Sequence, residues 1–164
     1  MSYIARVLVA MGAATMAAGG LHAQGVVMQR NLSMDLAKAI AEASVAECRS
    51  KGFHTSVVVV DRAGQALVML RDEQAGPHTA ELARRKAYTA RIFRITTIEF
   101  GQRTAADPSL APQRNLADVI ALGGGVPIKV GNDTIGAIGS AGSSNEMDDA
   151  CAKAGVAKVA ELLK

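Results

Sequence analysis

His78 and the residues around it carry the most recognisable chemistry in this sequence. They lie in "AGPHTAELARRKAYTARIFR", residues 75–94, which has helical spacing, and Pro77 suits a first helical position. His78 and Thr79 would then lie in the first turn. The helix dipole favours a neutral imidazole there, which is the form that binds a metal ion or haem iron. A surface histidine without a ligand is the alternative, and both interpretations stay open.

Lys86 borders a face of small residues on the same segment. Ala83, Ala87 and Ala90 recur at helical spacing, so this face can lie close against a sheet. Lys86 therefore either extends outward into solvent, as lysines commonly do, or points at an anionic ligand between helix and sheet.

Other charged residues are candidates for the same ligand. Arg71 and Asp72 end an expected strand just before the histidine and can line the same pocket. Arg84, Arg91 and Arg94 are typical of a solvated basic face that also attracts carboxylates. The sequence contains no Ser/His/Asp order or paired acidic motif specific enough to indicate a hydrolase.

A glycine-rich stretch, "ALGGGVPIKVGNDTIGAIGSAG", holds seven of the sixteen glycines. It lacks both the lysine of a phosphate-binding P-loop and the strand-to-helix context of a dinucleotide fingerprint. Residues 123–125 are better explained as a connection with unusual backbone angles, and Gly131 as part of a tight turn. Gly136 and Gly139 lie within an expected strand, where glycine indicates a bulge or the close approach of another group.

The elements that position these residues predict an α+β fold. Helices are expected within residues 32–52, 75–94 and 143–164, and strands at 57–60, 66–71, 116–122, 126–130 and 134–141. Residues 96–115 predict a short helix and a surface loop. Ser143 and Glu146 have capping-box spacing at the start of the last helix. The order helix, two strands, helix, three strands, helix predicts one mostly antiparallel sheet with helices packed against it.

The N-terminus has the layout of a secretory signal peptide. Arg6 precedes the apolar run "VLVAMGAATMAA", and cleavage is expected after Ala23, which leaves residues 24–164 as one domain. The run is too short for a membrane anchor. The net charge of +3 and the 3% aromatic content do not point to nucleic acid. We therefore expect a periplasmic or secreted protein with no nucleic-acid partner and no stable membrane anchor.

Taken together, several motifs resemble those of the GlcG/HbpS-like haem-binding family. They are "VVVVDRAGQALVMLRDE", "ARRKAYTA", "GGGVPIKVGNDTIGAIGSAG" and the "D" plus "ACAKAG" of the last helix, and they cover almost all of the mature chain in order. The resemblance implies a profilin-like fold with a five-stranded antiparallel sheet flanked by helices. It also implies that the first and last helices are neighbours, so a disulfide between Cys48 and Cys151 is a testable expectation. "GPHT", residues 76–79, departs from the shorter pattern of many relatives.

The resemblance further implies haem or tetrapyrrole binding, often in a homo-oligomer. Under this hypothesis His78 is the iron ligand, with Thr79 beside it. Lys86, Arg85 or Arg71 pairs with the propionates, and Gly124 and Gly125 make room for the ligand.

Two other functions remain open. One is a small enzyme, of the tautomerase or lyase type, that acts on a 2-oxo or dienol carboxylate. Lys86 and Arg71 would then bind the carboxylate and His78 would move a proton. The other is an accessory domain without a cofactor that contacts a partner through its surface.

Overall fold

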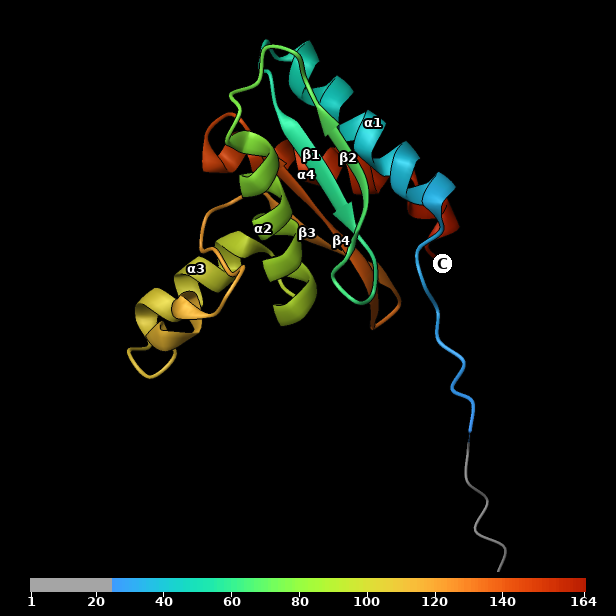
Figure 1. Cartoon of the computed structure of the whole chain (residues 1–164), viewed down its shortest axis with the longest axis vertical. Helices are drawn as coiled ribbons and strands as arrows, with labels where there is room; N and C mark the ends of the chain where they lie inside the picture. Colours follow the sequence, from blue (N-terminus) through green and yellow to red (C-terminus); the bar gives the residue numbers. More distant parts are fainter. Residues whose placement is uncertain (1–24) are drawn as a thin grey trace, which may run out of the picture.

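The computed structural model describes residues 25–164, so the expected signal peptide, residues 1–23, lies outside the described part. The elements are α1 Met34–Ser50, β1 Ser56–Val60, β2 Ala66–Arg71, α2 Thr79–Phe93, α3 Thr97–Ala106, η1 Ala111–Asn115, β3 Gly125–Val130, β4 Asp133–Ala141, α4 Asn145–Lys158 and η2 Ala160–Leu162 (Figure 1). This order confirms the α+β class. Among the described residues, no helix is long and apolar enough to cross a membrane.

One antiparallel sheet occupies the centre of the described structure. Its strands follow the order β2-β1-β4-β3, so β1 pairs with β2 on one side and with β4 on the other. Every residue of β1 is buried. The continuous apolar run of this strand thus matches a central position with both faces covered, which confirms the prediction from the sequence.

Helices cover the two faces of the sheet. On one face, Ile40 of α1 and residues of α4 pack with Val57 and Val59. On the other face, the alanines of α2 pack with Val58 and Val60. Because successive side chains of a strand point to opposite faces, β1 contributes to both cores. In Figure 1, α2 accordingly lies on the opposite side of the sheet from α1 and α4.

The contact between α2 and the sheet is close because small residues meet there. Ala83, Ala87 and Ala90 are fully buried. A Cβ added at Gly139 of β4 would lie 2.0 Å from the carbonyl oxygen of Ala83, inside any possible contact distance. The small-residue face and the close approach at Gly139 are thus confirmed.

The sheet has four strands rather than five, and the strand expected over residues 116–122 is wrong. Asp118 has a φ of 64°, in the left-handed region that a strand does not contain. Side chains of α2 take the backbone groups that a neighbouring strand would otherwise pair. Arg85 donates to the carbonyl oxygen of Val119, and the hydroxyl of Thr89 accepts a bond from the next amide. The segment is therefore a loop fastened to α2.

Two helix starts also differ from expectation. Pro77 lies in a turn, and His78 is the N-cap of α2, so the helix begins at Thr79, two residues later than expected. At α4, Ser144 is the N-cap in place of Ser143. The hydroxyl of Ser143 instead donates to the carboxylate of Asp148, 2.7 Å away, so it is not free to cap the helix.

A disulfide joins α1 to α4. Cys48 and Cys151 are bonded, with their Cα atoms 5.5 Å apart. The two helices pack side by side on one face of the sheet. The pairing implied by the family resemblance is therefore confirmed.

Candidate functional site

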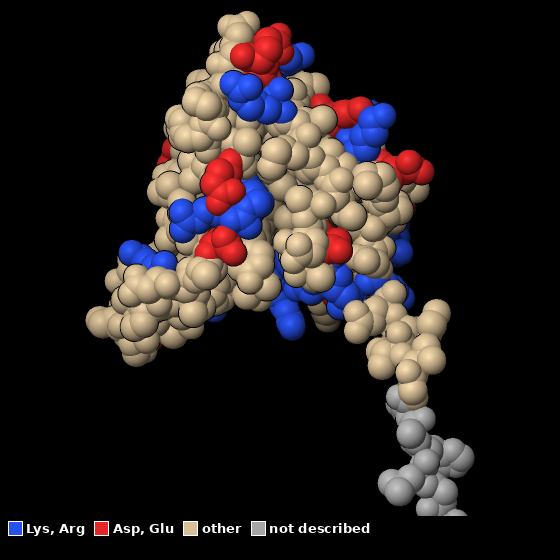
Figure 2. All heavy atoms as spheres, viewed as in Figure 1, with Lys and Arg blue, Asp and Glu red and all other residues tan. Residues whose placement is uncertain are grey.

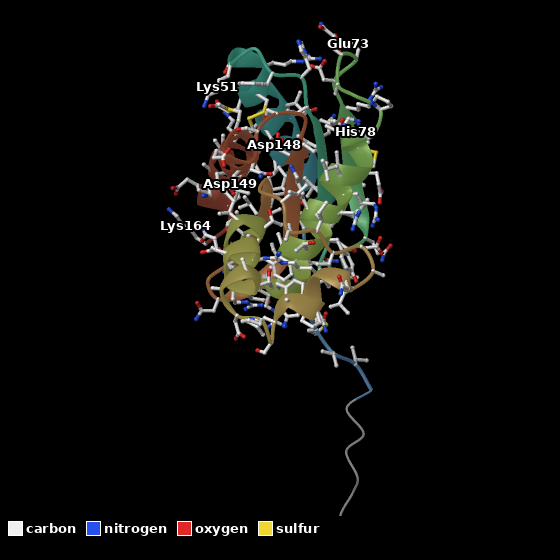
Figure 3. The ribbon with its side chains drawn as sticks, turned by 90° about the vertical axis from the view of Figure 1, so that its left-hand side faces the viewer. Lys51, Glu73, His78, Asp148, Asp149 and Lys164 are labelled. Carbon is white, nitrogen blue, oxygen red and sulfur yellow. A yellow bond between two sulfur atoms is a disulfide. The ribbon has the colours of Figure 1, made fainter. Side chains whose placement is uncertain are left out.

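A hollow of about 320 Å³ opens where α2 begins. Its lining residues are Gly76, His78, Thr79, Leu82, Lys86, Leu122, Gly142, Ser143, Asn145 and Asp148. They come from the turn before α2, from α2 itself, from the loop before β3 and from the start of α4. Figure 3 faces this side of the molecule, with His78 and Asp148 labelled in its upper part. The fold thus brings together His78, Thr79 and Lys86, three of the residues singled out from the sequence.

His78 lies on the rim of the hollow and is exposed. Although it is the N-cap residue of α2, its side chain forms no capping hydrogen bond. The ring stands over the backbone of Gly76, where an added Cβ would be 2.9 Å from its Cε1 atom. The glycine therefore leaves room for the imidazole, which remains accessible to an external ligand.

Thr79 holds the turn beneath the histidine. Its hydroxyl donates to the carbonyl oxygen of Gly76 at 2.7 Å and lies 2.7 Å from the hydroxyl of Ser56 in β1. Thr79 is only 4% exposed. The bond to Ser56 ties the start of α2 to the central strand and the bond to Gly76 holds the turn, so together they fix the position of the rim.

The inner wall of the hollow contains a buried ion pair. The Nζ of Lys86 lies 2.7 Å from Oδ2 of Asp148 and donates to the carbonyl oxygen of Ser140 at 3.0 Å. The other carboxylate oxygen of Asp148 accepts bonds from the amide and the hydroxyl of Ser143. Burial lowers the pKa of Lys86, and the carboxylate of Asp148 opposes that shift. Lys86 therefore neither extends into solvent nor stands free for a ligand.

Gly124 and Gly125 lie behind this wall. A Cβ added at Gly124 would lie 2.5 Å from the carbonyl oxygen of Ser140 and 3.1 Å from the Nζ of Lys86. Gly124 also has a φ of 117°. At Gly125, an added Cβ would be 2.3 Å from the carbonyl oxygen of Lys86. Both glycines are buried, and neither lines the hollow; they make room for the lysine and its helix.

Arg85 and Arg71, the other cations considered for a ligand, form hydrogen bonds elsewhere. The guanidinium of Arg85 donates to the carbonyl oxygen of Val119 at 2.7 Å. That of Arg71 donates to the carbonyl oxygen of Ala75, also at 2.7 Å. Neither residue lines the hollow.

Asp72 belongs to a separate polar cluster at the end of β2. It accepts a bond from Nε of Arg49 at 2.5 Å and lies 3.0 Å from Nδ1 of His54. The pKa of Asp72 is lowered to about 2, first by the backbone amide of Gln74 and next by Arg49. Asp72 is therefore directed towards α1 and not into the hollow.

Asp148 is the site residue that sequence reasoning missed. Nothing in its local pattern indicates that it pairs with a lysine 62 residues earlier. The available signal was Lys86 itself, because a lysine beside a fully apolar helix face requires an acidic partner if it is buried. Within residues 25–164, no group of three or more His, Cys, Asp or Glu residues is placed to hold a metal ion.

A family model described as "Haem degrading protein HbpS-like" matches residues 32–157. The chain belongs to the HbpS-like family. This confirms the resemblance identified from the sequence motifs, and it covers nearly all of the described HbpS-like domain.

Solved structures and a curated relative agree with this assignment. The crystal structure of HbpS is similar with a TM-score of 0.77 and 35% identity, covering 81% of this chain and 93% of HbpS. A PduOC:heme complex is similar with a TM-score of 0.70 and 27% identity, covering 77% of this chain and 94% of that protein. Protein GlcG of Escherichia coli K12 is 30% identical over 108 residues, which are 66% of this chain and 79% of GlcG. Haem is thus named both in the family description and in one structural neighbour.

Proposed function

We propose that this HbpS-like protein binds haem, with His78 as the iron ligand at the rim of the hollow. The observation that carries the proposal is the exposed imidazole of His78, because histidine is a common axial ligand of haem iron. Leu82 and Leu122 line the same hollow, and Leu122 is 39% exposed, so both can contact a macrocycle. The family description and the haem-bound neighbour support the same ligand.

The hollow fits the edge of a haem rather than the whole group. Its volume of about 320 Å³ is at the lower limit for small-molecule sites, and its inner wall is the polar pair of Lys86 and Asp148. A haem held by His78 would therefore remain largely exposed. Of the three cations considered for the propionates, only Lys86 lines the hollow, and its ammonium is already paired with Asp148. Bound haem would supply a redox-active iron, which His78 would hold in place.

A haemin titration of the mature protein tests the proposal. We expect a shifted Soret band with wild type and its loss in His78→Ala. His54→Gln is the matched control, because His54 is the only other histidine of the mature chain and bonds to Asp72 outside the hollow. An absent shift in wild type would reject haem binding, whereas an unchanged shift in His78→Ala would reject the ligand assignment alone.

We also propose that the protein is exported to the periplasm or secreted. The disulfide between Cys48 and Cys151 supports an oxidising compartment, since such bonds are rare in reducing ones. The test is to express the whole chain and determine the N-terminus of the product. Cleavage after Ala23 with recovery in the periplasm or medium is expected, and an uncleaved cytoplasmic product would reject export.

A homo-oligomer is proposed from the family resemblance. The edge strand β2 supports it, because Met69 is 50% exposed there and β2 has a sheet neighbour on one side only. Light scattering on the mature protein is the test, and a monomer at all concentrations would reject the proposal.

The polar character of the hollow favours a second candidate function. Asn145 and Ser143 line a space suited to a small polar ligand, and His78 at its rim could move a proton, whereas Lys86 on the inner wall is already paired with Asp148. We infer from this a small enzyme acting on a 2-oxo or dienol carboxylate. Turnover of such substrates by haem-free protein, lost in His78→Ala, would support this function. If the protein binds haem and turns over none of a set of 2-oxo and dienol carboxylates, the enzymatic function is rejected.

A further inference from the structure

A second, smaller pocket lies at the opposite end of α2. It measures about 210 Å³ and is lined by Arg62, Arg91, Arg94, Asn132, Asp133 and Thr134. These residues come from the turn after β1, from the last turn of α2 and from the start of β4. The two ends of this 15-residue helix are about 22 Å apart, so the pocket is separate from the one at His78.

Positive charge dominates this pocket. Three arginines line it against one carboxylate, that of Asp133, and Arg62 already forms an ion pair with this carboxylate. Arg62 also donates to the carbonyl oxygen of Arg30 at 2.7 Å. Asp61 is the other acidic group near Arg91. Figure 2 shows blue Lys and Arg side chains gathered at the end of the molecule from which the N-terminal segment leaves.

Two buried polar atoms of this pocket have no hydrogen-bond partner among the described residues. They are Nε of Arg91 and the hydroxyl oxygen of Thr134, a residue that is only 4% exposed. Leaving buried polar groups unpaired is unfavourable, because they have lost their hydrogen bonds to water. A basic residue in the last turn of a helix is favoured by the helix dipole, which explains the position of Arg91 but not its unpaired Nε. The Nε of Arg91 can only donate a hydrogen bond, and the hydroxyl of Thr134 can also donate one. Acceptor oxygens from a ligand would therefore pair with both atoms.

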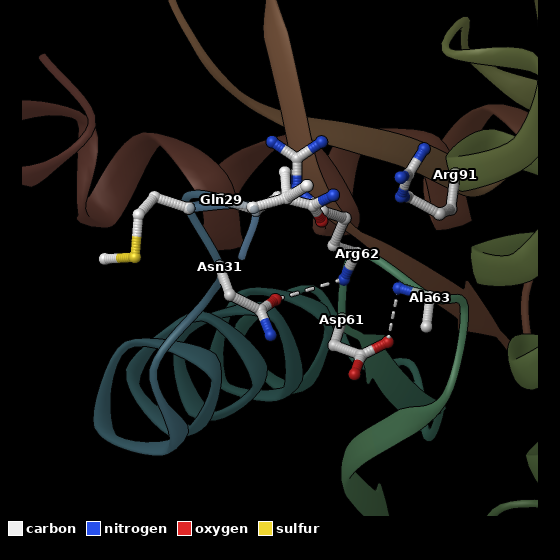
Figure 4. A pocket seen from close by; sticks show the side chains of 8 residues that line it. Gln29, Asn31, Asp61, Arg62, Ala63 and Arg91 are labelled. Carbon is white, nitrogen blue, oxygen red and sulfur yellow. Dashed lines mark hydrogen bonds between the residues drawn. The ribbon is translucent and has the colours of Figure 1, made fainter. Parts of the chain in front are cut away.

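Arg91 is also reached from a wider hollow next to the pocket. This hollow is about 670 Å³ and is lined by residues of the N-terminal segment together with Arg62 and Arg91. Figure 4 shows Arg62 and Arg91 on its wall, contributed by the hairpin and by α2 respectively. A ligand larger than the pocket could therefore extend towards Gln29 and Asn31.

We propose that this pocket, named here the Arg91 pocket, binds the oxyanion group of a small anionic ligand. A phosphate, sulfate or carboxylate group supplies several acceptor oxygens, which match the forked donors of the arginines. The same oxygens would accept from the Arg91 Nε and from the Thr134 hydroxyl. The ligand would also balance the excess charge of three arginines facing one aspartate.

Thermal unfolding and calorimetric titration of the mature protein test this proposal. The probes are sodium phosphate, sulfate and citrate, each compared with sodium chloride at equal ionic strength. We expect at least one of the two anion classes, the tetrahedral anions phosphate and sulfate or the carboxylate citrate, to raise the Tm more than chloride does. The responding anion then separates a tetrahedral ligand from a carboxylate ligand. Equal effects of all salts would overturn the proposal.

Variants locate the effect. Arg91→Gln and Thr134→Val should each weaken anion binding, by about tenfold or more for the arginine, because a charge-assisted hydrogen bond is lost. Arg103→Gln is the matched control, since Arg103 lies in the last turn of α3 outside the Arg91 pocket, where its guanidinium donates to Gln113 and lies over the ring of Phe93. Thr134→Val should fold without loss of stability, because the hydroxyl it removes is unpaired. Undiminished anion binding in both Arg91→Gln and Thr134→Val would overturn the assignment.

Discussion

Lys86 of α2 and Asp148 of α4 form an ion pair in which both side chains are only 2% exposed. The pair joins helices from the two faces of the sheet and forms the inner wall of the hollow beside His78. Breaking a buried pair leaves one charge without its partner, which is far more costly than losing an exposed pair.

The first prediction concerns this pair. Asp148→Ala should lower the free energy of unfolding by about 3–5 kcal/mol, because it leaves the lysine ammonium buried and uncompensated. Replacing both residues, as Lys86→Met with Asp148→Leu, should recover part of the loss. Urea unfolding measures both changes. Lys38→Ala, which removes an exposed pair with Glu42, should change stability by less than about 1 kcal/mol. A similar small loss for Asp148→Ala would contradict the buried pair.

The second prediction concerns stability at acid pH. The pKa of Asp72 is about 2 in the folded protein against an ordinary value of 3.8. A lowered pKa means that Asp72 stabilises the fold above about pH 4, and that this contribution is lost as the pH falls towards 2. Asp72→Asn should therefore reduce stability at neutral pH and flatten the acid side of the stability profile. The measurement is the urea midpoint between pH 2 and 6. Glu42→Gln serves as the exposed control, and a parallel profile for Asp72→Asn would refute the prediction.

The third prediction concerns the disulfide. Cys48 and Cys151 are 103 residues apart in sequence, so their bond restricts a large part of the unfolded chain. Replacing both by alanine should cost about 2–5 kcal/mol. Thermal unfolding with and without a reductant measures this. The reductant should lower the Tm of wild type and leave the double variant unchanged, and equal sensitivity of the two proteins would argue against the bond in solution.

The fourth prediction concerns the contact between α2 and β4. In Gly139→Ala the new Cβ would meet the backbone of Ala83 at 2.0 Å, so the helix must move away from the sheet. We expect a loss of at least about 1–3 kcal/mol, the usual cost of overpacking a core. Gly25→Ala, where nothing lies within 4 Å of the added atom, should be neutral. If α2 positions His78, haem binding should also weaken in Gly139→Ala. Wild-type stability of this variant would contradict the close contact between Gly139 and the backbone of Ala83.

Local patterns in the sequence were sufficient for much of the fold. The apolar run of β1 predicted a central strand, and the alanines of α2 with Gly139 predicted a close helix–sheet contact. Periodicity and residue size act over a few neighbouring residues, so they can be read without knowing the rest of the structure. The family motifs added the disulfide between Cys48 and Cys151, because they implied which helices are neighbours.

Tertiary structure decided which polar groups are paired. Residues 116–122 have the composition of a strand, yet they form a loop because α2 side chains bind their backbone. From the sequence, Lys86 could have faced solvent or a ligand. The fold instead places Asp148, 62 residues later in the chain, within hydrogen-bonding distance of it, so both residues form the inner wall of the hollow. Arg91 was interpreted as part of a solvated basic face, but its Nε is buried without a partner and the residue lines a pocket together with Thr134.

The sequence by itself therefore determined most of the element order, the central strand, the family and the residues able to do chemistry. The tertiary structure decided which of those residues face a hollow, which are held by other parts of the protein and which lack a partner. The physical reason is that periodicity and size are local properties of the chain, whereas the pairing of a buried donor depends on elements that are distant in sequence.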